Sequence, residues 1–138
     1  MATTIGNFYA YSDYVKVNGA NLFTTIMLPN KGGKFPTVIM RSPYNYDTNQ
    51  LDEDRTVSYL LDRHLKFLKR GYAVVFQHCR STGKSDGFWQ PYVNEREDTL
   101  ALYDYIRKQS FYNKQLLLAG ESFYSSAHYA ASPLKMTL

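Results

Sequence analysis

The chain has 138 residues, enough for one domain with a hydrophobic core and too few for two. Its content of 44% hydrophobic and 20% charged residues excludes a disordered chain. The net charge of +4 comes from scattered basic residues. The densest basic cluster (Arg63, Lys66, Lys69 and Arg70) lies beside a helical apolar pattern, which indicates a solvated helix face rather than a nucleic-acid site.

No targeting or membrane segment is visible in the sequence. The first seven residues lack the charged and apolar regions of a signal peptide, and no apolar run approaches the ~18 residues of a membrane span. The single cysteine excludes an internal disulfide and a CxxC metal signature. We therefore expect a cytoplasmic protein forming one domain over residues 1–138. We expect it to have no cofactor, no metal, no nucleic-acid partner and no membrane partner.

The first half of the chain begins with a predicted β-hairpin. Residues 14–17 and 22–28 form its strands, and Asn18-Gly19 supplies the positive φ angles that a tight turn demands. After a Pro- and Gly-containing loop, the apolar run 37–40 predicts a buried strand.

A helix is expected from Glu53 to Lys69, because Val57, Leu60, Leu61, Leu65 and Leu68 form one apolar stripe. Gly71 is its predicted stop. Residues 72–76 then form a second predicted buried strand.

The second half continues the alternation of strands and helices. Asn94 is a predicted N-cap, with Glu97 completing a capping box, for a helix that ends near Gln109. Residues 116–119 form a third buried strand, and residues 123–131 suit a short helix. Strands that alternate with helices on short connections predict an α/β fold: a β-hairpin followed by parallel strands, with helices on both faces.

The segment after the third buried strand has the features of a nucleophile elbow. Ser122 lies at the strand-to-helix turn where an α/β-hydrolase presents its nucleophile, and Gly120 allows strand and helix to approach closely. The backbone N–H of Phe123 is available to a developing oxyanion. Tyr124 stands where the G-x-S-x-G pattern has its second glycine, so Ser122 as a simple helix N-cap remains an alternative.

Other candidate sites have structural interpretations. Residues 82–85 resemble part of a phosphate-binding P-loop but lack its first glycine. Glu95, Glu97 and Asp98 fall in the first turn of a predicted helix, where they offset the helix dipole. Cys79 follows a strand end and is expected to be a small, half-buried loop residue.

Several segments, in order, resemble the family of cocaine esterase, α-amino-acid ester hydrolases and X-prolyl dipeptidyl-peptidases. These segments are residues 35–45, 70–75, 83–87, 91–98 and 120–123. The resemblance covers roughly residues 15–131 and implies the amino-terminal half of an α/β-hydrolase fold.

The resemblance also implies roles for three residues. It makes Ser122 the acyl-forming nucleophile, Tyr44 an oxyanion-hole hydroxyl and Phe123 the residue that donates an oxyanion-hole amide. The chain departs from the family pattern where Tyr124 and Ser125 replace the glycine that usually follows the serine.

A serine nucleophile needs a histidine base that is oriented by a carboxylate. No Asp or Glu follows Ser122, and His128 lies six residues on, about 600° around a helix, so its ring is not aimed back at the serine. His64 is expected on a helix face. His78 follows the second parallel strand and would approach Ser122 only if their strands adjoin.

Two functions follow as expectations. The first is a serine hydrolase that cleaves a small-molecule ester or a peptide amide through an acyl-serine, on a chain that lacks the acid and histidine of the triad. The second is a truncated, non-catalytic α/β domain that acts in binding or assembly. A truncated sheet would expose an unpaired edge through which the chain could self-associate.

Overall fold

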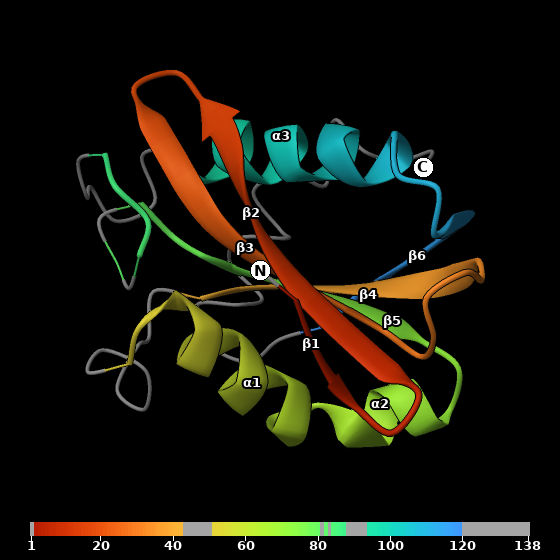
Figure 1. Cartoon of the computed structure of the whole chain (residues 1–138). Helices are drawn as coiled ribbons and strands as arrows, with labels where there is room; N and C mark the ends of the chain where they lie inside the picture. Colours follow the sequence, from red (N-terminus) through yellow and green to blue (C-terminus); the bar gives the residue numbers. More distant parts are fainter. Residues whose placement is uncertain (1, 43–50, 81, 83, 88–93, 120–138) are drawn as a thin grey trace.

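A computed structural model of the chain describes residues 2–42, 51–80, 82, 84–87 and 94–119. These residues form one six-stranded sheet, with strand order β1-β2-β3-β5-β4-β6. The strands are β1 (Ala2–Ile5), β2 (Phe8–Val17), β3 (Ala20–Leu28), β4 (Phe35–Ser42), β5 (Ala73–His78) and β6 (Tyr112–Leu118). The helices are α1 (Glu53–Arg63), α2 (Leu65–Lys69) and α3 (Glu95–Arg107). Helix α3 covers one face of the sheet, and α1 and α2 cover the other (Figure 1).

The predicted hairpin is β2 and β3, which pair antiparallel from Tyr9 opposite Leu28 to Val17 opposite Ala20. Gly19 has φ of 75°, the left-handed conformation that its turn requires and that glycine adopts at no steric cost. The structure adds strand β1, which was not predicted from the sequence and which pairs with the start of β2.

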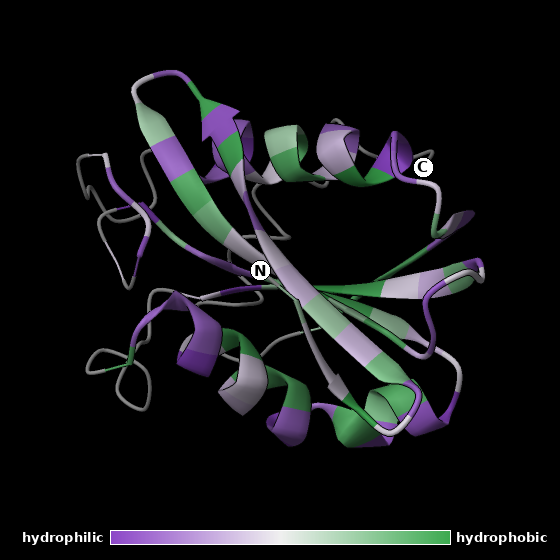
Figure 2. Cartoon of the chain, viewed as in Figure 1, coloured by the Kyte–Doolittle hydropathy of each residue, from purple (hydrophilic) through white to green (hydrophobic). Residues whose placement is uncertain are grey.

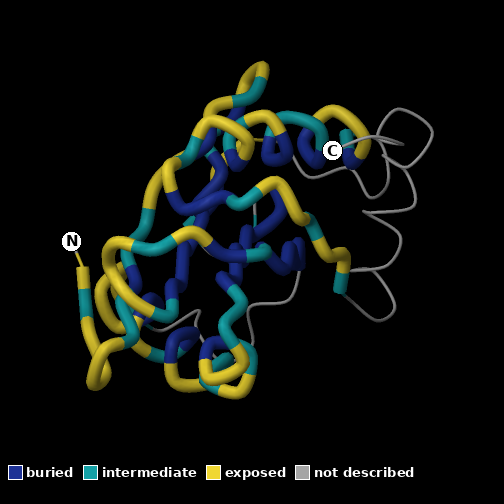
Figure 3. Tube along the Cα trace, turned by 90° about the vertical axis from the view of Figure 1, so that its right-hand side faces the viewer, coloured by how far each residue is buried: buried dark blue, intermediate teal, exposed yellow. Residues whose placement is uncertain are grey.

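The parallel part of the sheet confirms the predicted α/β arrangement. Strand β4 lies between β5 and β6 and runs parallel to both. Parallel strands covered on both faces must be apolar on both faces. Accordingly, Ile39 belongs to the cluster against α3, whereas Val38 and Met40 belong to the cluster against α1 and α2. Figure 2 shows hydrophobic residues along β4 and β5, and Figure 3 shows the buried strands at the centre of the molecule.

The prediction of one helix from Glu53 to Lys69 is wrong in one respect, because the helix is interrupted at His64. Asp52 caps α1 by accepting a hydrogen bond from the Arg55 N–H at 2.8 Å. His64 then ends α1 and begins α2, with Nδ1 2.7 Å from the Leu60 carbonyl oxygen. The apolar stripe nevertheless stays on one side, because Val57, Leu60, Leu61 and Leu68 are buried in the same cluster. Gly71, with φ of 88°, follows the end of α2 as predicted.

Two consecutive residues of β2 connect the sheet to the helix layers on opposite faces. The Tyr14 hydroxyl donates to Glu53 of α1 at 2.7 Å, and the Tyr105 hydroxyl of α3 donates to Asp13 at 2.7 Å. Successive side chains of a strand point to opposite faces, so one short stretch of β2 reaches both layers. Burial and the Glu53 carboxylate raise the pKa of Tyr14 to about 12, so its hydroxyl remains a donor at neutral pH.

Strand β6 contains a local irregularity. Its register against β4 shifts between Phe35 and Thr37, and Lys114 has φ of 75°. A side chain in this left-handed region costs about 1 kcal/mol because Cβ approaches the backbone carbonyl. We therefore expect Lys114→Gly to raise the free energy of unfolding by about 0.5–1 kcal/mol in urea denaturation.

The neighbouring Gln115 provides the matched control. It is exposed like Lys114 but is not among the residues with positive φ, so Gln115→Gly should lower stability through backbone entropy. Equal destabilisation by the two glycines would contradict the assignment of strain to Lys114.

Candidate functional site

The carboxyl ends of three parallel strands meet at one edge of the sheet, where α/β proteins place their chemistry. In the β4–β6 pair, Val38 lies opposite Leu117 and Ile39 opposite Leu118. The backbone N–H of Ala119 donates to the Ile39 carbonyl oxygen at 3.2 Å and continues the pairing past the end of β6. The strand before Tyr44 therefore adjoins the strand before Ser122.

The three site residues named from the sequence, Ser122, Tyr44 and Phe123, lie outside the described residues. Their roles stay predictions. The capping alternative for Ser122, the helix expected over residues 123–131, and His128 also lie outside the described residues.

His78 does not lie on a strand beside the one that leads to Ser122. It ends β5, and β4 separates β5 from β6. Its side chain is buried, with ring centroids 5.3 Å from Phe76 and 6.1 Å from Phe23. Burial lowers the pKa of His78 to about 4, so the ring is neutral near pH 7. The condition under which His78 could serve as the base is not met, because the two strands do not adjoin.

His64 is likewise a packing residue. Its ring lies 5.7 Å from that of Phe76, and burial lowers the pKa of the imidazole. The hydrogen-bond contact of Nδ1 with Leu60 belongs to the junction between α1 and α2.

The loop after β5 is fastened to the sheet by Ser85. The Ser85 hydroxyl accepts from the Phe23 backbone N–H at 2.7 Å and donates to the His78 carbonyl oxygen at 2.7 Å. Asp86 accepts from both the backbone and the side-chain amide of Asn21. The Ser85 hydroxyl is therefore engaged in hydrogen bonds within the protein. This agrees with a structural role for the described part of residues 82–85 and not with a P-loop.

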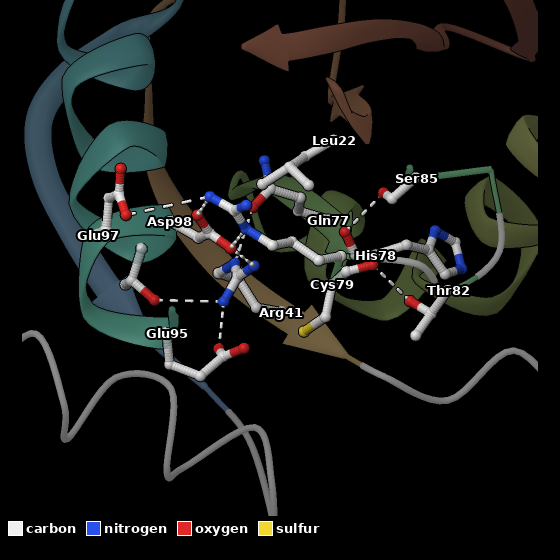
Figure 4. Close-up of polar contacts among 12 residues, drawn as sticks. Leu22, Arg41, Gln77, His78, Cys79, Thr82, Ser85, Glu95, Glu97 and Asp98 are labelled. Atoms are coloured by element: carbon white, nitrogen blue, oxygen red, sulfur yellow. Dashed lines mark hydrogen bonds and ion pairs between the residues drawn. The ribbon is translucent and has the colours of Figure 1, made fainter. Parts of the chain in front are cut away.

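A buried cluster of charges, which was not predicted from the sequence, lies at the ends of β4 and β5 (Figure 4). Arg41 is 0% exposed and forms an ion pair and hydrogen bond with Glu95. Asp98, also 0% exposed, accepts two hydrogen bonds from Arg80, at 2.8 and 2.9 Å. Glu97 lies at the rim, 43% exposed and 4.0 Å from Arg80. Arg41, Arg80, Glu95 and Asp98 together form the arginine–carboxylate cluster.

This cluster corrects two predictions. Glu95 and Asp98 do not simply offset the dipole of α3; Glu95 is a buried partner of Arg41 on β4, and Asp98 is a buried partner of Arg80, which follows β5. Asn94 is the N-cap, but its side chain makes no capping hydrogen bond, so the predicted capping box does not form. The available signal was Arg41 itself, a charged residue directly after the apolar run 37–40, because a charge in a buried strand requires a partner.

Cys79 is more buried than predicted. It is 0% exposed, and its backbone N–H donates to the Ser42 carbonyl oxygen at 2.9 Å. Burial raises the pKa of the thiol to about 12, which keeps it protonated and unreactive near neutral pH. Cys79 is therefore a structural residue at the strand ends.

Within the described ranges, no group of three or more His, Cys, Asp or Glu side chains is arranged to hold a metal ion. The described helices also include none that is long and apolar enough to cross a membrane.

Comparison with known proteins agrees with this architecture. Residues 18–135 match the X-Pro dipeptidyl-peptidase family, S15. Cocaine esterase from Rhodococcus sp. (strain MB1 Bresler) is 25% identical over 116 residues, which are 83% of this chain and 19% of that protein. The chain thus spans about a fifth of the length of this curated relative.

Solved structures show the same fold. An α-amino acid ester hydrolase superposes with a TM-score of 0.71 at 22% identity, covering 91% of this chain and 23% of that one. A CocE/NonD family hydrolase from Staphylococcus aureus gives a TM-score of 0.72 at 22% identity, covering 93% and 26%. An α/β serine hydrolase from Xanthomonas campestris gives 0.66 at 23% identity, covering 93% and 57%.

The family match covers most of the chain, and the fold superposes on these hydrolase structures with TM-scores of 0.66 to 0.72. The chain belongs to the X-Pro dipeptidyl-peptidase (S15) family of hydrolases and has the fold of the amino-terminal part of an α/β-hydrolase domain.

Proposed function

We propose that the chain carries the nucleophile and the oxyanion hole of a serine hydrolase. The Ser122 hydroxyl attacks the carbonyl carbon of an ester or amide, its proton passes to a base, and the alcohol or amine leaves. Water then hydrolyses the acyl-serine. The substrate class, a small acyl ester or a peptide with an X-Pro bond, follows from the names of the family and of its cocaine esterase relative.

The observation that supports this proposal most directly is the pairing of β4 with β6. Tyr44 follows Ile39 by five residues and Ser122 follows Leu118 by four, and Ile39 and Leu118 are opposite each other in the register. Two chain segments that leave neighbouring strand ends are suited to bring a phenol donor and the Phe123 N–H to one carbonyl oxygen. Each such donor typically lowers the barrier by ~3 kcal/mol.

A fluorophosphonate probe tests the proposal, because it phosphonylates an activated serine. We expect the native protein, in the form in which its gene expresses it, to be labelled on Ser122, as located by peptide mass spectrometry. Ser122→Ala should abolish the labelling. Ser125→Ala and Ser126→Ala remove neighbouring serines and should leave it intact. An unlabelled native protein, or labelling that persists in Ser122→Ala, would contradict the proposal.

A second candidate function, assembly without catalysis, draws support from the edge of the sheet. In the described part of the chain, β6 pairs on one side only, with β4, and Leu117 and Leu118 are 40% and 48% exposed. Apolar side chains on a strand edge favour pairing with another chain. Ester hydrolysis that disappears in Ser122→Ala would exclude a purely assembling role.

A further inference from the structure

Joining helix α3 to the sheet through the arginine–carboxylate cluster carries a large desolvation cost. Arg41 and Asp98 are both 0% exposed, and the desolvation of buried ions often cancels their attraction. Apolar residues would pack α3 against β4 at lower cost, as Ile39 already does two residues before Arg41. Stability alone therefore does not account for a guanidinium at the end of β4, whereas directional hydrogen bonds to several elements do.

Arg41 connects the end of β4 both to the neighbouring strand β5 and to helix α3. Its Nε donates to Oε1 of Gln77 on β5 at 2.7 Å, and Nη1 donates to Glu95 and, at 3.4 Å, to the Thr99 hydroxyl of α3. Gln77 passes the connection on to β3 by donating to the Thr24 hydroxyl at 3.0 Å. A planar guanidinium holds these acceptors in fixed relative directions, which a lysine ammonium does not.

The opposite side of the guanidinium faces the second ion pair. Nη2 of Arg41 lies 3.9 Å from Oδ2 of Asp98, and Asp98 is itself held by two hydrogen bonds from Arg80. The Ser42 carbonyl, directly after Arg41, accepts the Cys79 N–H. The end of β4 is therefore held by β5, by α3 and by the residue that follows β5.

From this geometry we propose that Arg41 is a positioning residue for the hydrolase site. By fixing the end of β4, it sets where the chain leaves the sheet toward Tyr44, and so controls the reactivity of Ser122. This inference rests on the proposed function. It assigns to Arg41 no contact with the substrate.

The rate of fluorophosphonate labelling at Ser122 is the first readout. We expect Arg41→Lys to slow labelling at least ~10-fold, because lysine keeps the positive charge but lacks the planar guanidinium and its fixed N–H donors. The matched control is Arg107→Lys. Arg107 is an exposed arginine that pairs with Asp104 near the end of α3. This control should label at the wild-type rate.

A double variant separates positioning from stability. Arg41→Met with Glu95→Gln removes both charges of one buried pair, a change that proteins often tolerate without loss of stability. We expect its thermal unfolding midpoint to lie near that of the wild type while labelling stays slow. Labelling that recovers together with the unfolding midpoint would overturn the proposal, because Arg41 would then be merely structural.

Alkylation of Cys79 by iodoacetamide gives a readout that does not depend on Ser122. The thiol is fully buried beside the strand end, so loosening that end should speed alkylation several-fold in the Arg41 variants and not in Arg107→Lys. If the wild type is unlabelled at Ser122, the proposed function fails, and the alkylation rates still decide whether Arg41 holds the strand end. Unchanged alkylation in both Arg41 variants would overturn that part.

Discussion

Replacing Asp98 with asparagine is expected to lower the free energy of unfolding by about 3–5 kcal/mol. Asp98 is fully buried, accepts two hydrogen bonds from Arg80 and lies 3.9 Å from Nη2 of Arg41. Neutralising it leaves two guanidinium groups with Glu95 as their single buried carboxylate, because Glu97 is 43% exposed. The side-chain volume hardly changes, so the loss reports the uncompensated charge rather than a cavity.

The adjacent Glu97 supplies a control on the same helix turn. It is 43% exposed and reaches Arg80 at 4.0 Å, so solvent screens the interaction. Glu97→Gln should cost less than about 1 kcal/mol. Urea denaturation followed by circular dichroism measures both variants under the same conditions. Similar losses for the two substitutions would contradict a buried, coupled role for Asp98.

Acidification is expected to destabilise the protein through His78. The ring is 1% exposed, its Nδ1 has no hydrogen-bond partner among the described residues, and burial lowers its pKa from 6.5 to about 4. The fold therefore favours the neutral ring. Its contribution to stability is fully present above pH 6.5 and is lost as the pH falls from there toward about 4, by about 3 kcal/mol in total.

Substitution of His78 isolates this effect from other titrating groups. His78→Leu keeps a similar volume between Phe23 and Phe76 and removes the titration, so its free energy of unfolding should vary much less between pH 7 and pH 4.5. The control is His64→Gln, which leaves the His78 ring in place and should retain most of the wild-type dependence. A wild-type pH profile in His78→Leu would refute the assignment.

Local sequence patterns predicted the elements that depend on local backbone physics. Gly19 and Gly71 mark a turn and a helix end because a positive φ is a property of the residue and its immediate neighbours. The apolar run 37–40 marks β4 because a strand covered on both faces needs apolar residues throughout. By contrast, the positive φ of Lys114 arises where the β4–β6 register shifts, and no local pattern marks such a pairing irregularity.

In the candidate site, too, local sequence features predicted some parts, and the tertiary structure decided others. The sequence identified Ser122, Tyr44 and Phe123 as candidates through a motif and a family resemblance. It left the choice of neighbouring strands open, and the order β5-β4-β6 decides that choice. In that order, the strand before Tyr44 (β4) pairs with the strand before Ser122 (β6). The strand that ends at His78 (β5) lies on the other side of β4 and does not adjoin β6.

By itself the sequence determined the α/β class, the approximate extent of most elements and the hydrolase family, because periodicity, turn residues and motifs are local properties. Only the tertiary structure decided which strands pair and which charges meet. Arg41 and Glu95 are 54 residues apart in the chain, yet they form one buried ion pair. Strand pairing and ion pairing between distant segments depend on the packing of the whole sheet against α3, so no stretch of sequence near Arg41 contains that information.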